Sequence, residues 1–144
     1  MVMNFQVTFD CASPDTLATF WSGALGYHAA DPPDGFDSWE EWNAKLEIPE
    51  EEWEDGAWIV DPEERRPRIC FLRVAEGKVA KNRIHLDLDA SDGPAAPLER
   101  RKQQVDAAVE RVVALGATVF AAYEEPDHYH VTMRDPEGNE FCLR

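Results

Sequence analysis

The sequence predicts an α+β domain made of two copies of a β-α-β-β-β module, whose sheets should pair into a cup. In the first half of the chain, an alternating strand over Phe5–Cys11 leads into a helix that ends at Leu25. In the second half, an alternating strand over Ile84–Asp89 leads, after a loop, into a helix that ends at Leu115. Further short strands follow each helix. We therefore expect one domain, with module one over residues 1–76 and module two over residues 79–144.

The first strand and helix have readable boundaries. Apolar and polar residues alternate along the strand, with Gln6 and Thr8 on its polar face, as in a half-buried strand. Ser13 is a candidate N-cap, and Pro14 stands at the first helical position, where its missing N–H costs no hydrogen bond. Gly26 then provides a suitable end for the helix.

Residues 31–56 read as an insertion in module one. A Pro- and Gly-containing loop opens it, and the capping-box pattern at Ser38–Glu41 predicts a short helix to about Leu46. Another turn is expected from Pro49. The segment is acidic and contains Trp39, Trp42 and Trp53, which a mere linker would not need. These indoles either cover a ligand site or pack the insertion onto the sheet.

The remaining elements follow from short apolar runs and turn signals. In module one we expect two more strands, at Ala57–Val60 and Arg68–Val74. In module two we expect strands at Asn82–Ala90, Thr118–Tyr123, Tyr129–Arg134 and Glu140–Leu143, a helix at Leu98–Leu115, and a tight turn at Asp135–Asn139.

Composition narrows the class of protein. The net charge of −15 opposes binding to phosphate backbones, so nucleic acid is not an expected partner. No run approaches the roughly 18 apolar residues of a membrane span, and the N-terminus lacks a signal-peptide pattern, which favours the cytoplasm. Cys11, Cys70 and Cys142 are odd in number and far apart, as reduced thiols would be.

Several motifs together resemble one known family. Asp135–Phe141 resembles the closing turn and strand of the vicinal oxygen chelate (glyoxalase/bleomycin-resistance) superfamily. Phe20–Tyr27 resembles the end of its first helix, whereas Lys81–Leu88 and Ser38–Trp42 resemble a glyoxalase-like subgroup. The resemblance covers essentially the whole chain. It implies paired modules around a concave site, and commonly a homodimer, which would also cover exposed sheet edges.

The resemblance also implies four inward metal-ligand positions, which this chain fills incompletely. In the metal enzymes of the superfamily, the ion polarises two adjacent substrate oxygens. The first position falls at Gln6, the third at His85, and the fourth at Cys142, where a Glu is usual. The second falls within Arg68–Val74, which has no acidic residue. Gln6, His85 and Cys142 are the only candidate ligands, so we expect no resident cofactor, with a divalent metal ion as the alternative.

The function that we predict is metal-free binding of a small molecule in a concave site covered by the Trp-rich insertion. The expected ligand-binding residues are Gln6, Thr8, Trp39, Trp42, Trp53, His85 and Asp87. Bleomycin-resistance relatives, which bind ligands without chemistry, provide the precedent for this class.

Two alternatives stay open. The first is a lyase, isomerase or dioxygenase that uses either a degenerate metal site or an acid/base pair of His85 and Asp87, the candidate catalytic residues. The second is a structural or interaction dimer with a vestigial cup. For His85 itself, the alternative to a metal ligand is a polar wall residue of the cup, hydrogen-bonded to a neighbour such as Asp87 or Gln6. His128 and His130 share one strand face and either chelate a metal or face outward from an edge strand.

Overall fold

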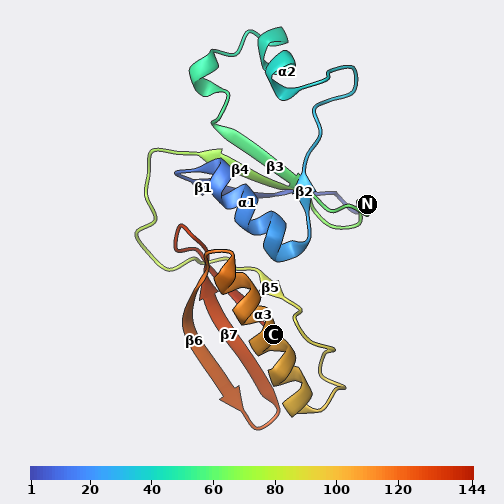
Figure 1. Ribbon diagram of the computed structural model, residues 1–144, viewed down its shortest axis with the longest axis vertical. Coiled ribbons are helices and arrows are strands. Elements are labelled where there is room, and N and C mark those ends of the chain that lie inside the picture. Colours follow the sequence, from blue (N-terminus) through green and yellow to red (C-terminus); the bar gives the residue numbers. More distant parts are fainter. The chain divides into compact units, whose positions relative to one another are not determined.

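Each half of the chain forms its own four-stranded sheet with a helix packed on one face (Figure 1). The computed structural model describes residues 1–144 and separates into two units, Met1–Gly77 and Lys78–Arg144. The strand order is β1-β4-β3-β2 in the first unit and β5-β8-β7-β6 in the second, and neither sheet closes on itself. The predicted α+β class and the repeated β-α-β-β-β order are therefore confirmed. The cup that the two sheets would form together stays a prediction, as does the homodimer.

The first unit is built from β1 (Val7–Cys11), α1 (Pro14–Leu25), β2 (His28–Ala29), β3 (Gly56–Val60) and β4 (Ile69–Arg73). The edge strand β1 runs parallel to β4, and the other pairings are antiparallel. Helix α1 packs on β3 and β4 through buried Leu17, Phe20 and Trp21. Gly26 ends this helix in the left-handed region with φ 73°, as expected.

The insertion between β2 and β3 contains α2 (Trp39–Lys45) and the 3₁₀ helix η1 (Glu50–Glu52). The predicted cap by Ser38 is confirmed, since Glu41 N donates to Ser38 Oγ at 3.1 Å. The Glu41 side chain reaches back one residue further than in a standard capping box, because Glu41 Oε2 accepts from Asp37 N at 2.9 Å. Ser13 does stand at the N-cap of α1, but its hydroxyl donates to Thr16 Oγ1 at 2.8 Å instead of capping a backbone amide.

The second unit contains β5 (Asp87–Leu88), α3 (Leu98–Ala114), β6 (Thr118–Glu125), β7 (His128–Arg134) and β8 (Glu140–Leu143). Helix α3 packs mainly against β7 and buries Val105 and Val112 (Figure 1). Val131, Met133, Phe141 and Leu143 are buried on the sheet. No helix in either unit combines the length and the apolar character needed to cross a bilayer.

The predicted strand Asn82–Ala90 is wrong over most of its length, because only Asp87–Leu88 is a strand. Its single neighbour is the short β8, and the main-chain bonds between them involve Leu86, Leu88 and Ala90. Before this point the Asn82 amide donates to the side chain of Glu140 at 3.0 Å, and Ile84 is 86% exposed. A side chain thus takes the hydrogen bond that a strand partner would have supplied.

An Asp-Pro-Glu turn joins the last two strands in each unit. Asp61 is 3% exposed and accepts from Glu63 N at 3.1 Å, whereas Asp135 is 3% exposed and accepts from Glu137 N at 3.0 Å. The hydrogen bond from the Glu63 amide, together with the Arg66 guanidinium, lowers the pKa of Asp61 below its ordinary value. Burial acts in the opposite direction and is outweighed. The internal repeat therefore extends to the turns, which use a carboxylate to satisfy backbone N–H groups.

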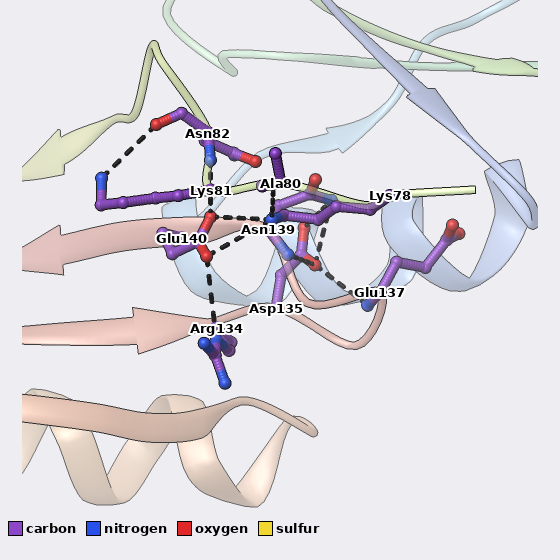
Figure 2. Close-up of polar contacts among 9 residues, drawn as sticks. All are labelled: Lys78, Ala80, Lys81, Asn82, Arg134, Asp135, Glu137, Asn139 and Glu140. Carbon is purple, nitrogen blue, oxygen red and sulfur yellow. Dashed lines mark hydrogen bonds and ion pairs between the residues drawn. The ribbon is translucent and has the colours of Figure 1, made fainter. Parts of the chain in front are cut away.

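Glu140 links the start of the second unit to β8 (Figure 2). Its side chain is 4% exposed and lies 3.1 Å from Lys78 Nζ. Burial alone would raise the pKa of Glu140, but the Asn82 amide and the Lys78 ammonium outweigh it and lower that pKa.

Acid is therefore expected to weaken the second unit through Glu140. Because the folded-state pKa of Glu140 is lowered, its contribution is complete above its ordinary value of 4.5 and is lost as the pH falls through the lower, folded-state pKa. Urea denaturation followed by far-UV circular dichroism at pH 7 and pH 3 measures this loss. Glu140→Gln should make stability less dependent on pH over this range. Glu99→Gln is the control, because Glu99 is 81% exposed on α3. Equal acid sensitivity of Glu140→Gln and wild type would contradict the assignment.

Candidate functional site

The first candidate site is an open pocket of about 790 Å³ in the first unit, between α1, the outer part of β3 and the insertion. This size is within the range of small-molecule sites. Its aromatic walls are Trp39 of α2, Trp53, which follows η1, and Trp58 of β3. We call it the indole pocket. It exists because β2 covers β3 only at Ile59 and Val60, so the edge of β3 beyond them faces the insertion.

The indoles are held in place by specific contacts. Trp39 stacks on Trp58 with ring centres 5.1 Å apart and an interplanar angle of 18°. Trp39 Nε1 donates to Ala30 O at 3.0 Å, and Trp53 Nε1 donates to Ile48 O at 2.9 Å. A Cβ at Gly56 would lie 2.7 Å from the Trp58 ring, so this position needs glycine. The insertion is thus packed onto the sheet and lines a pocket at the same time.

The polar part of the indole pocket is acidic. Asp15 comes from the first turn of α1, and Glu52 and Glu54 come from the insertion. Thr19, Ser22 and Asn43 add neutral polar groups. The ion pairs of this unit lie elsewhere, at Asp55, Asp61 and Glu63. The Arg68 guanidinium lies 5.6 Å from the centre of the Trp58 ring, so one cation already neighbours this wall. The three carboxylates outnumber it, and this balance beside three indoles favours a positively charged ligand.

The second candidate site lies on the sheet of the second unit, on the face that α3 does not cover. The strand register places Asp87 beside Cys142, and Cys142 beside Thr132. A smaller pocket of about 300 Å³ opens here, lined also by His85, Tyr123, His128, His130 and Arg144. Alternation along the strands explains this lining, because the intervening Val131, Phe141 and Leu143 are buried in the core.

Several titratable groups meet in this polar pocket. His85 Nδ1 lies 3.1 Å from Asp87 Oδ1, with the two side chains 38% and 41% exposed. A ring nitrogen of His85, a carboxylate oxygen of Asp87 and Cys142 Sγ all lie within 4.8 Å of one another. His128 Nε2 and His130 Nδ1 are 2.9 Å apart, and Tyr123 stacks on His130. Burial and then the neighbouring His128 lower the pKa of His130.

The predicted site residues divide between the two units. Trp39 and Trp53 share the indole pocket, but the Trp42 ring packs on Phe36 at 4.9 Å and does not line it. Gln6 and Thr8 are exposed on or next to β1 and do not line it either. In the second unit, His85, Asp87 and Cys142 come together. A shared site of Gln6 with His85, under a Trp-rich cover, stays a prediction.

Sequence reasoning missed some lining residues. Trp58 could have been predicted as a third aromatic wall of the indole pocket, because it lies in the strand that directly follows the Trp-rich insertion. Tyr123, Thr132 and Arg144 had no such signal, since only the register of strands distant in sequence brings them to one pocket. His128 and His130 lie on β7, an inner strand between β8 and β6, so the edge-strand interpretation of them is wrong.

Two four-stranded sheets built from repeated β-α-β-β-β modules define an α+β fold, and each of the two units has a pocket. Residues 6–144 match the model of the glyoxalase-like domain family, and the chain belongs to this family. Its structural neighbours are in the glyoxalase/bleomycin-resistance/dioxygenase, or vicinal oxygen chelate, superfamily, which confirms the resemblance. No curated protein sequence matches the chain significantly.

Solved structures with low sequence identity share the fold. One is a glyoxalase/bleomycin resistance protein/dioxygenase family enzyme from Burkholderia phytofirmans, with 19% identity, coverage of 96% of this chain and 94% of that one, and a TM-score of 0.58. Another is the fosfomycin resistance protein FosX from Listeria monocytogenes, with 12% identity, coverage of 100% and 90%, and a TM-score of 0.62. A glyoxalase-related enzyme from Fulvimarina pelagi has 12% identity, coverage of 99% and 87%, and a TM-score of 0.59.

The FosX structure contains Mn(II), which raises the question of which metal ion the side chains of this chain would suit. Within the second unit, His85, Asp87 and Cys142 offer one nitrogen, one oxygen and one sulfur. Such a mixed set suits Zn²⁺, whereas Mn²⁺ and Mg²⁺ prefer oxygen-rich sites. These three residues could therefore hold Zn²⁺, and they do not fit a hard divalent ion.

Proposed function

We propose that this protein binds a small planar organic cation in the indole pocket. The observation that carries the proposal is the meeting of three anchored indoles with three carboxylates around about 790 Å³. Flat apolar walls with a few placed polar groups are typical of small-molecule sites. The proposal refines the expected binding role of Trp39 and Trp53 and adds Trp58.

Charge and aromatic surface both favour a cation. An organic cation over an indole face gains about 0.5–1 kcal/mol at an exposed site and more when desolvated. Asp15 and Glu52 line the pocket from different elements, so two separate parts of the chain bring negative charge to a ligand there. We also propose that binding here needs no metal ion. The only group in the structure with metal-binding spacing is His85, Asp87 and Cys142, outside this pocket.

Proflavine, a planar cationic dye, is a suitable probe. We expect it to bind wild type at least tenfold more tightly than the anionic dye 8-anilinonaphthalene-1-sulfonate. Trp39→Leu and Trp53→Leu should each weaken proflavine binding about tenfold, because each removes one aromatic wall. A fluorescence titration of proflavine with protein measures these affinities. Trp42→Leu is the matched control, because Trp42 belongs to the same insertion but packs on Phe36.

The charge contribution has its own matched pair of variants. Replacing Glu52 and Glu54 together by Gln should weaken proflavine binding about fivefold to tenfold, and added salt should reduce the difference. Replacing Glu50 and Glu51 by Gln is the control, since neither residue lines the pocket. Equal loss of affinity in both double variants, or tighter binding of the anionic dye, would overturn the proposal.

A further inference from the structure

The polar pocket of the second unit contains a thiol, an imidazole and a carboxylate whose polar atoms lie close to one another. Cys142 comes from β8, Asp87 from the adjacent β5, and His85 from the residues just before β5. The groups lie within 4.8 Å of one another, and Asp87 Oδ1 is 3.1 Å from His85 Nδ1. This cluster is separate from the indole pocket and is not used by the proposed function.

A carboxylate beside an imidazole, and an imidazole near a thiol, is an arrangement that can activate the thiol. A carboxylate at Nδ1 fixes the orientation and tautomer of an imidazole, which leaves Nε2 to exchange a proton with a neighbouring thiol. A thiolate is the nucleophilic form of cysteine, and an adjacent imidazole is a common means of producing it. Such sets are recognised by geometry and roles, whatever the order of the residues along the chain.

Cys142 differs from the other two cysteines in its surroundings. Cys11 and Cys70 are 3% and 6% exposed, and burial raises the pKa of Cys70. Cys142 is half-buried and opens into the polar pocket of about 300 Å³, with Thr132 Oγ1 at 3.5 Å from its Sγ. Only Cys142 therefore combines access from a pocket with a nearby imidazole and carboxylate.

We propose that Cys142 is a nucleophile toward small α,β-unsaturated carbonyl compounds, with His85 as its base and Asp87 as the residue that positions His85. In this reaction the Cys142 proton moves to His85, and Sγ forms a bond to the β-carbon of the ligand. The C=C π pair shifts toward the carbonyl, and the α-carbon then takes the proton from His85. Nothing leaves and no oxidant or cofactor is consumed, so the addition is balanced.

The other groups of the pocket suit such a ligand. Negative charge gathers on the carbonyl oxygen during the addition, and preorganised donors stabilise it. Arg144 and Tyr123 line the same pocket and carry groups that can donate hydrogen bonds. Arg144 also forms a solvent-exposed ion pair with Asp89, with Nε 3.2 Å from Oδ1.

N-ethylmaleimide, an α,β-unsaturated carbonyl reagent, tests the proposal directly. Intact-mass kinetics should show a single fast addition, which peptide mapping places on Cys142, while Cys11 and Cys70 stay unmodified in the folded protein. We expect the rate to exceed that of N-acetylcysteine at least tenfold and to fall at least tenfold in His85→Gln. His28→Gln makes the same substitution in the first unit and should leave the rate unchanged. Cys142→Ser should remove the fast addition.

Further measurements separate the roles of His85 and Asp87 from mere structural support. Asp87→Asn should slow the reaction, and Asp87→Glu should restore part of the rate. Alkylation of Cys142 by iodoacetamide should show the same dependence on His85 and Asp87, because the proton transfer to His85 does not depend on the electrophile. His85→Asn provides a second variant if His85→Gln proves unfolded by circular dichroism.

Two results would overturn the proposal. One is a wild-type rate no greater than that of N-acetylcysteine. The other is a slow rate that rises when EDTA removes Zn²⁺ from the protein, which would make Cys142 a metal ligand instead. Neither result affects proflavine binding, so failure here and failure of the proposed function are distinguishable.

Discussion

Replacing Phe71 with alanine is expected to lower the free energy of unfolding of the first unit by about 3–5 kcal/mol, the usual cost of removing a buried phenyl ring. Phe71 is fully buried in the inner strand β4, and its ring centre lies 5.4 Å from that of Phe9. The surrounding side chains come from two strands and α1, so they cannot collapse freely into the space. A cavity in this position should weaken the whole unit.

Urea denaturation followed by tryptophan fluorescence measures this effect. All five tryptophans lie at or before Trp58, so the signal reports on the first unit alone. Leu72→Ala is the matched control, because Leu72 is the next residue of the strand, points to the other face and is 43% exposed. We expect it to cost about 1 kcal/mol or less. Similar losses for Phe71→Ala and Leu72→Ala would show that α1 does not enclose the core as described.

Asp135→Ala is expected to destabilise the second unit by about 2–3 kcal/mol. The reason is that the N–H groups of the turn between β7 and β8 would lose the buried carboxylate that accepts their hydrogen bonds. Asp135 accepts from Glu137 N and Asn139 N, both at 3.0 Å, and from Asn139 Nδ2 at 2.9 Å (Figure 2). These bonds set the turn between β7 and β8. Asp135→Asn keeps one acceptor oxygen and should lose only about 1 kcal/mol.

This unit has no tryptophan, so a different measurement is needed. Far-UV circular dichroism in urea gives the stability, and hydrogen exchange of the β8 amides shows whether the turn is the part that opens. Asp89→Ala is the control, because the Asp89 side chain is 80% exposed in its pair with Arg144. If Asp135→Ala left exchange in β8 unchanged, the carboxylate would not organise this turn.

The two candidate sites make separate demands on the chain. The indole pocket depends on packing of the insertion onto β3, and its proposed ligand is recognised by charge and flat apolar surface. The polar pocket depends on strand register, and its proposed chemistry needs a thiol beside an imidazole. One protein can therefore lose either property through a single substitution and keep the other.

Local patterns in the sequence were enough to predict the architecture. The alternation in β1, the proline and glycine at the ends of α1, and the capping box at Ser38 act between near neighbours in the chain. Such signals can be recognised in a single sequence because the interactions that cause them are local. They predicted the repeated β-α-β-β-β order and almost every helix end.

Only the tertiary structure decided which side chains meet. Alternation placed His85 and Asp87 on one face, but their contact with Cys142 depends on the pairing of β5 with β8. The Asn82 amide, predicted to lie in a strand, donates instead to the side chain of Glu140, which is distant in the sequence. The stacking of Trp39 on Trp58 likewise joins an insertion to a strand. Long-range register and packing depend on the whole set of competing contacts, so the sequence determined the modules and the folded chain determined their sites.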